Sequence, residues 1–129
     1  MSQKRSFKSR ATVVALEGEL GSGKTTFVQH FARACGITES VLSPTFVILK
    51  SYTLKAKSSK LIHIDAYRLK NAKELEDLGI YELMADEQNI IFIEWASRVQ
   101  DILPNNTIRI HFDHVDEHRR KIRILNNKL

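Results

Sequence analysis

The sequence predicts an α/β fold, a three-layer sandwich with a mostly parallel central sheet and a C-terminal antiparallel hairpin. Three observations indicate it. The aliphatic run at residues 13–16 is typical of a strand buried on both faces, and it leads directly into the glycine-rich segment "GELGSGKTT" and an amphipathic helix. A second aliphatic run at residues 89–96 suits a central strand. Apolar and charged residues alternate within 108–112 and 121–124, which predicts two half-buried strands.

The first helix follows the glycine-rich segment. Apolar residues recur at helical spacing between positions 27 and 35, and Gly36 is well placed to end the helix in a left-handed conformation. Segments 43–54 and 60–67 are rich in strand-forming residues, and the first of them opens with a Ser-Pro turn signal. The lysine- and serine-rich residues 55–60 between these strands are expected to form an exposed turn.

The second half of the chain predicts two further helical segments. Residues 71–85 carry a helical pattern that Gly79 interrupts, so we expect a broken helix. The segment "ASRVQDIL", residues 96–103, has a helical pattern that stops at Pro104. The alternating residues that follow are expected to close the chain as a hairpin.

Composition predicts one globular domain. The chain has 129 residues, of which 43% are hydrophobic and 27% charged, so a basic and flexible leader at residues 1–10 and a single domain at 11–129 are expected. The net charge of +5 comes from short basic clusters that are typical of solvated loops and strand ends. A lone cysteine, Cys35, permits no internal disulfide, and no apolar run is long enough to span a membrane. A cytoplasmic protein without membrane contact is expected.

Residues Gly18 to Thr25 match the phosphate-binding pattern G-x-x-x-x-G-K-[ST] in full, between a buried strand and a helix. The glycines allow the backbone to turn its amide groups around an anion, and the helix N-terminus adds partial positive charge. In such P-loops Lys24 reaches the outer phosphates, and the hydroxyl of Thr25 binds the Mg²⁺ that accompanies a nucleoside triphosphate. The sequence therefore predicts a P-loop NTPase-like fold.

Two acids are candidates for the metal site or for catalysis. Asp65 follows the apolar run "LIHI" and Glu94 follows "IIFI", so both are expected at the carboxyl edge of the sheet, where ligands of open α/β sheets bind. Composition does not rank them, and an acid after an apolar strand is as often a helix cap or a loop residue.

Three further residues have weaker functional interpretations. Thr45 in "SPTF" could sense a γ-phosphate, and Arg68 in "DAYR" could neutralise charge on a departing phosphate. A turn residue and a surface ion pair are the favoured alternatives for these two positions. Trp95 could stack on a nucleotide base, although a tryptophan after a central strand more often packs in the core.

The segment "HFDHVDEH", residues 111–118, suggests a metal site by its histidines and acids. It falls where the last hairpin is expected to turn, and its histidines would need a helix to converge on one ion. We therefore expect a solvated turn instead of a metal site.

Together these motifs resemble the TsaE (YjeE) family, small P-loop ATPases of bacterial and organellar tRNA modification. The shared segments are "GELGSGKTT", "SPTF", "HIDAYRL", "ELEDLGIYE" and "IEWA", which occur in the family's order and at about its spacing. The resemblance covers residues 13–124. It implies a protein that acts with TsaB and TsaD, and through them indirectly with tRNA, in making threonylcarbamoyladenosine, and that hydrolyses ATP to reset this complex between rounds of transfer.

The resemblance also implies roles for individual residues. Thr25 and Glu94 are expected to hold Mg²⁺, and Asp65 to orient water or the switch region, with Thr45 as the switch threonine. The ATP cradle is expected from Lys24 and the amides of the surrounding loop, which comprises Gly21, Ser22, Gly23, Thr25 and Thr26. Trp95 is a further candidate for contact with the cofactor because of its place next to Glu94, and not because of the resemblance.

One departure from the family pattern is a short N-terminus, because many members carry an extra strand and helix that help to enclose the adenine. A guanine-recognition motif is absent from the plausible loops, so ATP is the expected nucleotide.

Two other functions compete with an ATPase of tRNA modification. A small-molecule P-loop kinase would need a lid and an acceptor pocket, for which the chain has little room. A binding switch would use ATP to order the Thr45 loop, with slow hydrolysis.

Overall fold

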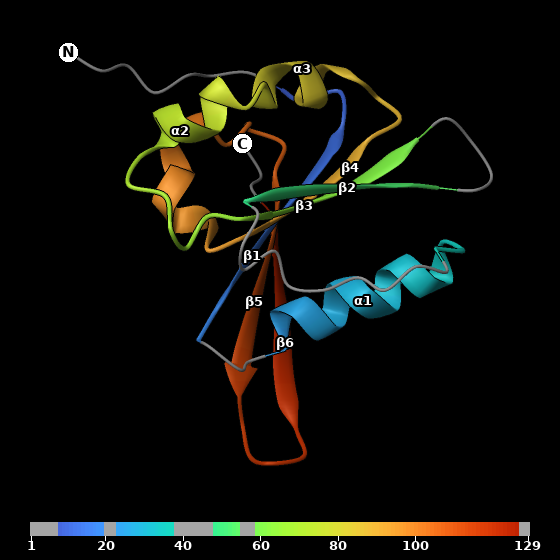
Figure 1. Cartoon of the computed structure of the whole chain (residues 1–129). Coiled ribbons are helices and arrows are strands. Elements are labelled where there is room, and N and C mark those ends of the chain that lie inside the picture. Colours follow the sequence, from blue (N-terminus) through green and yellow to red (C-terminus); the bar gives the residue numbers. More distant parts are fainter. Residues whose placement is uncertain (1–7, 20–22, 38–47, 55–58, 127–129) are drawn as a thin grey trace.

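The computed structural model describes residues 8–19, 23–37, 48–54 and 59–126 (Figure 1). Its elements in chain order are β1 (Thr12–Gly18), α1 (Lys24–Ala34), β2 (Leu49–Thr53), β3 (Lys60–Asp65), α2 (Ala72–Asp77), α3 (Ile80–Ala85), β4 (Ile90–Glu94), the 3₁₀ helix η1 (Ala96–Ile102), β5 (Ile108–His114) and β6 (Arg120–Asn126). Several sequence predictions fall outside the described residues, namely most of the leader, Gly21, Ser22, Thr45 and most of the 55–60 turn.

The strands form one mixed sheet in the order β2-β3-β4-β1-β5-β6. The four inner strands, in the order β3-β4-β1-β5, are all parallel to one another. The edge strands β2 and β6 are antiparallel to β3 and β5. The predicted α/β fold with a mostly parallel sheet and a C-terminal antiparallel hairpin is therefore confirmed.

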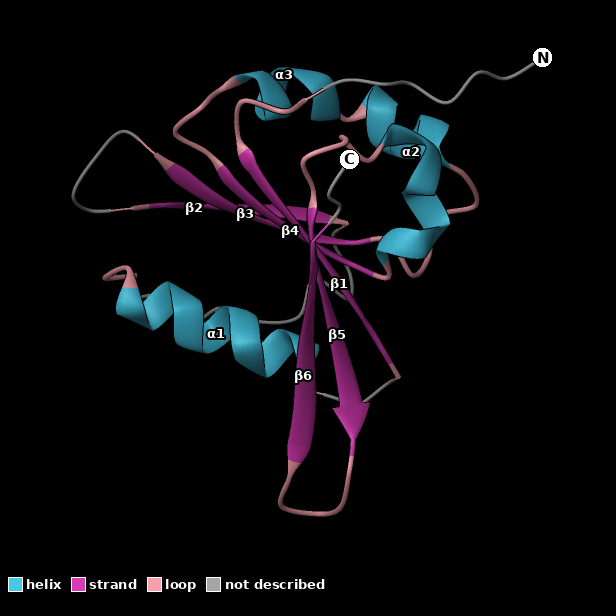
Figure 2. Ribbon diagram, turned by 180° about the vertical axis from the view of Figure 1, so that it is seen from behind, coloured by secondary structure: helices cyan, strands magenta, loops and turns pink. Residues whose placement is uncertain are grey.

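Helices cover both faces of the sheet, which makes three layers (Figure 2). The alternation of side chains along β1 divides the core, because Val13 and Ala15 face α2, α3 and η1, whereas Val14 and Leu16 face α1. All four residues are buried, as the aliphatic run predicts for a strand covered on both sides. Fully burying a valine or leucine side chain of this run stabilises the fold by about 1.5–3 kcal/mol.

Glycines end or interrupt the helices where the sequence predicts it. Gly36 follows α1 with φ 87°, and Gly79 separates α2 from α3 with φ 84°, both in the left-handed region. Within the described ranges no helix has the length and apolar character that crossing a membrane requires.

The helix expected at residues 96–103 is a 3₁₀ helix, η1, with a non-helical residue at Val99. Its buried residues are Ala96, Val99 and Ile102. This spacing of three residues matches the roughly three residues per turn of a 3₁₀ helix. The three side chains therefore lie on one side of the segment and pack in the core with residues of the sheet. Pro104 follows shortly after η1 ends, as predicted.

Candidate functional site

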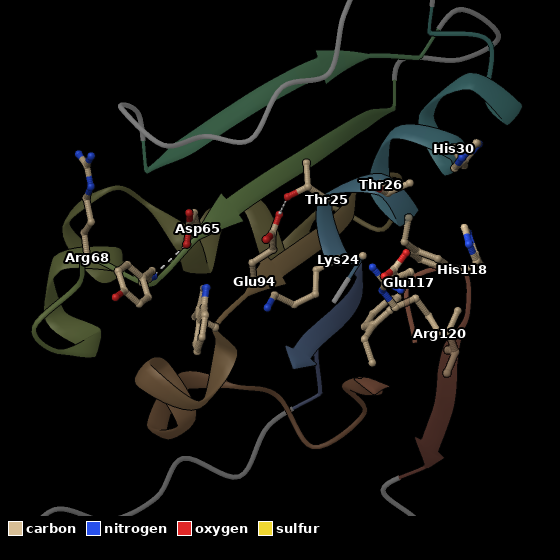
Figure 3. Close-up of a pocket in the computed structure, with 16 residues that line it drawn as sticks. Lys24, Thr25, Thr26, His30, Asp65, Arg68, Glu94, Glu117, His118 and Arg120 are labelled. Carbon is tan, nitrogen blue, oxygen red and sulfur yellow. Dashed lines mark hydrogen bonds between the residues drawn. The ribbon is translucent and has the colours of Figure 1, made fainter. Parts of the chain in front are cut away.

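A pocket of about 810 Å³ lies where β3 and β4 end and α1 begins (Figure 3). Its walls come from the start of α1, the residues at the ends of β3 and β4, and the β5–β6 hairpin. Open α/β sheets bind their ligands at this carboxyl edge of the parallel strands. The pocket therefore lies at the edge of the sheet that the sequence predicts for the functional site.

The N-terminus of α1 opens into this pocket. Gly23 precedes the helix with φ 104°, a conformation that strains any residue with a side chain. Among the described residues, no side chain caps this helix end. Lys24, Thr25 and Thr26 line the pocket from the first turn, whose amide groups have no acceptor within the helix. Such a helix end is suited to bind an anion.

Lys24 supplies a positive charge beside these amides, and only 5% of its surface is exposed. Its Nζ donates to the carbonyl oxygens of Gly18 and Glu19 and lies 4.4 Å from the centre of the Trp95 ring. Burial lowers the pKa of the Lys24 ammonium, while nearby carboxylates, Glu94 foremost, raise it. Because charged acceptors form stronger hydrogen bonds than carbonyl oxygens, phosphate oxygens can replace these main-chain partners.

Thr25 and Glu94 are brought together from α1 and β4. The Thr25 hydroxyl donates to Oε2 of Glu94 at 2.9 Å, the contact drawn as a dashed line in Figure 3. Glu94 is 4% exposed and pairs in register with Asp65 of β3, so the two candidate acids sit on neighbouring strands. Of the two, it is Glu94 that contacts the P-loop threonine.

Asp65 lies at the end of β3 and lines the same pocket. Its Oδ1 accepts a hydrogen bond from the Tyr67 amide at 2.9 Å, which shapes the turn after the strand. Arg68 is exposed and lies on the far side of Asp65 from Lys24 (Figure 3). Asp65 thus lines the same pocket as Lys24 and Thr25, and Arg68 lines it from an exposed position.

Trp95 follows β4 with φ 58° and is, among the described residues, the non-glycine residue with positive φ. A left-handed conformation of this kind costs a bulky residue free energy and occurs preferentially at functional sites. The ring packs against Tyr67, with centroids 5.0 Å apart, and under the Lys24 ammonium. Trp95 therefore both lines the pocket and packs with its neighbours, and its contact with a cofactor stays a prediction.

The donor set at this position fits Mg²⁺. A hydroxyl and a carboxylate in contact at the start of α1 are hard oxygen ligands of the kind that Mg²⁺ takes together with substrate phosphates. In the part of the chain that the structure describes, no cluster of three or more histidine, cysteine or acidic side chains could hold a metal by protein ligands alone.

The histidine-rich segment at 111–118 forms the end of β5 and a turn. Asp116 accepts hydrogen bonds from the His118 amide and the Arg119 side chain, which lower the pKa of its carboxyl group. Asp113 binds Arg123 of β6 at 2.9 Å. Asp113 and Asp116 are thus paired within the hairpin, and His114, Val115, Glu117 and His118 are exposed, as expected for a solvated turn.

Sequence reasoning missed two parts of the site. The β5–β6 hairpin contributes Glu117, His118 and Arg120 to the pocket, opposite the ends of β3 and β4 (Figure 3). His63 of β3 is fully buried, and its Nε2 lies 2.5 Å from Oε2 of Glu94. The sequence did offer a signal for His63. This histidine lies within the aliphatic run "LIHI", so a polar ring is expected among core residues there.

The chain is similar to known proteins over most of its length. The family model described as threonylcarbamoyl adenosine biosynthesis protein TsaE matches residues 2–122. The chain is 39% identical to the tRNA threonylcarbamoyladenosine biosynthesis protein TsaE of Bacillus subtilis over 90% of this chain and 70% of that protein. It is 35% identical to the protein of the same name from Rickettsia conorii, over 89% of this chain and 64% of that one.

A solved structure has the same fold. The crystal structure of Bacillus subtilis YdiB matches with a TM-score of 0.69 and 33% identity, over 90% of this chain and 68% of that one. The chain thus spans between 64 and 70% of the length of these relatives.

Proposed function

The chain belongs to the TsaE family of threonylcarbamoyl adenosine biosynthesis proteins, and on that premise we propose that it binds and hydrolyses ATP with Mg²⁺ at the pocket beside α1. We further propose that hydrolysis acts on a complex of TsaB and TsaD, so that threonylcarbamoyl transfer to tRNA can proceed through several rounds. The observation that carries this proposal is the convergence of Lys24, Thr25 and Glu94 on one pocket at the start of α1. We propose one domain over residues 11–129 and a cytoplasmic location, where tRNA is modified.

Four of the residues that line the pocket have a role in this proposal. The Lys24 ammonium and the first-turn amides of α1 bind the outer phosphates. The ammonium is a nearly buried charged donor, and the amides are donors that have no acceptor within the helix. Thr25 and Glu94 hold Mg²⁺, which neutralises charge on the phosphate oxygens. Asp65 ends the strand next to β4 and pairs in register with Glu94, so both acids line the pocket. From this position Asp65 orients the attacking water.

Replacing Asp65 by asparagine is expected to leave ATP affinity within about 2-fold and to slow turnover by roughly 100- to 10,000-fold, the usual contribution of an acid or base group. The asparagine Oδ1 can still accept the Tyr67 amide, so the turn after β3 should keep its shape. Binding is measured by calorimetry with a non-hydrolysable ATP analogue, and turnover by phosphate release. Asp77→Asn, at an exposed ion pair with Lys73, serves as the matched control. An Asp65→Asn variant that failed to bind ATP would contradict this division of roles.

The proposed function is tested by an ATPase assay of the chain alone, with TsaB and TsaD, and with tRNA added. Slow turnover alone and a rise with the partners are expected, because partner contacts complete many such sites. Transfer of the γ-phosphate to a small molecule would instead identify a kinase. Binding of the partners that depends on ATP, without any stimulation of hydrolysis, would indicate a switch.

A further inference from the structure

His63 is a buried polar residue in the middle of a hydrophobic strand. Its side chain is 0% exposed, and its backbone pairs in register with Phe92 of β4. Its neighbours in β3, Ile62 and Ile64, are fully buried in the core on the opposite face. Burying a polar ring costs free energy unless the ring forms hydrogen bonds, so the contacts of this imidazole explain its presence.

Within the described residues, one ring nitrogen of His63 has a hydrogen-bond partner and the other has none. Nε2 lies 2.5 Å from Oε2 of Glu94, and because a carboxylate offers only acceptors, Nε2 is the donor. Among the residues that the structure describes, Nδ1 has no hydrogen-bond partner, although it is buried. An apolar side chain would fill this space without that cost, so packing alone does not account for a histidine here.

The Glu94 oxygen that His63 contacts is the same oxygen that Thr25 contacts. Oε2 receives Nε2–H from β3 and the Thr25 hydroxyl from α1, at 2.5 and 2.9 Å. The three residues come from three different elements, and they form one hydrogen-bonded chain from the sheet to the P-loop helix. The imidazole therefore fixes the rotamer in which the Glu94 carboxylate is directed toward Thr25.

We propose, resting on the ATP and Mg²⁺ role proposed above, that His63 is a positioning residue that holds Glu94 in line with Thr25 for the metal. It touches neither phosphate nor metal and acts through Glu94. Partners that orient a metal-binding carboxylate typically contribute 10- to 100-fold to metal affinity or activity. Loss of the Nε2 donor should thus weaken the use of Mg²⁺ without weakening the binding of metal-free nucleotide.

Two substitutions separate positioning from packing. His63→Leu removes the donor and keeps a similar volume, whereas His63→Gln carries an amide N–H at about the distance of Nε2 from the backbone. The affinity of a non-hydrolysable ATP analogue is measured by calorimetry over a series of Mg²⁺ concentrations and also in EDTA. For His63→Leu the Mg²⁺ concentration at half-maximal effect should rise roughly 10- to 100-fold, with affinity in EDTA within about 2-fold of the wild type. His63→Gln should restore most of the Mg²⁺ dependence.

Stability gives an independent readout. Since the leucine removes a buried nitrogen that has no partner among the described residues, His63→Leu should unfold at an equal or higher denaturant concentration than the wild type while its Mg²⁺ response is impaired. Ile62→Val is the matched control, because Ile62 lies on the same strand and faces the other side of the sheet. It should lower stability and leave the Mg²⁺ dependence unchanged. His63→Phe removes the same donor with a ring, and replaces the leucine variant if that variant does not fold.

The outcomes distinguish this role from the proposed function. An unchanged Mg²⁺ dependence in His63→Leu or His63→Phe, or equal losses in the leucine and glutamine variants, would overturn the positioning role alone. A wild-type protein whose nucleotide affinity does not respond to Mg²⁺ would overturn the proposed metal site and the positioning role together.

Discussion

Replacing Lys24 by alanine is expected to weaken ATP binding by roughly 10- to 150-fold, which corresponds to the 1.5–3 kcal/mol that a hydrogen bond to a charged group typically contributes. Lys24 is nearly buried, and its Nζ donates to two main-chain carbonyl oxygens. A phosphate that binds Nζ therefore replaces these carbonyl contacts and displaces little water. Calorimetric titration with an ATP analogue and Mg²⁺ measures the effect.

The control for this substitution is a lysine of the same charge that lies outside the pocket. Lys73→Ala removes an exposed cation paired with Asp77 on α2, and it should leave ATP affinity unchanged. Circular dichroism and denaturant unfolding show whether Lys24→Ala remains folded. If the folded Lys24→Ala variant bound ATP as tightly as the wild type, the phosphate site would have to lie elsewhere.

The parts of the fold that were predictable are those set by local sequence. The aliphatic run of β1 is buried on both faces because helices cover both sides of the sheet, and Gly36 and Gly79 adopt the left-handed conformation that favours glycine. The place of Lys24 and Thr25 in the first turn of a helix was predictable, because the glycine-rich motif directly precedes them between a strand and an amphipathic segment. In each case the signal lies within a few residues of the feature.

The parts that were not predictable depend on long-range pairing. The contact between His63 and Glu94 joins residues 31 positions apart, and it exists because β3 and β4 are parallel neighbours in one register. A sequence pattern indicates each strand but not its neighbour. The same holds for Arg120, which lies across the pocket from β3 because β6 pairs with β5.

Strand pattern does not choose between Asp65 and Glu94, and only the resemblance to the TsaE family ranked Glu94 first for the metal. Both acids end a parallel strand, and their backbones pair in register, so strand pattern alone treats them alike. Their side chains differ in what they contact, because Glu94 accepts the Thr25 hydroxyl and Asp65 accepts the Tyr67 amide of its own turn. This difference supports the proposal of Glu94 for the metal and Asp65 for the water.

Replacing Glu94 by glutamine is expected to slow Mg²⁺-dependent turnover by roughly 100- to 1,000-fold, the usual effect of losing one preorganised electrostatic contact at a reacting phosphate. The amide keeps one oxygen that can accept from Thr25 and His63, and it removes a buried charge. The free energy of unfolding should therefore change by only about 1 kcal/mol. Phosphate release beside TsaB and TsaD measures turnover, and denaturant unfolding measures stability.

A second readout of Glu94→Gln follows from Lys24. The charge of Glu94 raises the pKa of the Lys24 ammonium, so its removal lowers that pKa further below the usual 10.5. Because the protonated ammonium is the form that attracts phosphate, ATP affinity should begin to fall at a lower pH on the alkaline side in Glu94→Gln than in the wild type. Glu82→Gln on α3, outside the pocket lining, should show the wild-type profile.

Normal ATP hydrolysis by Glu94→Gln beside TsaB and TsaD would contradict the metal role of Glu94. The metal role would then pass to Asp65, and Glu94 would only orient Thr25.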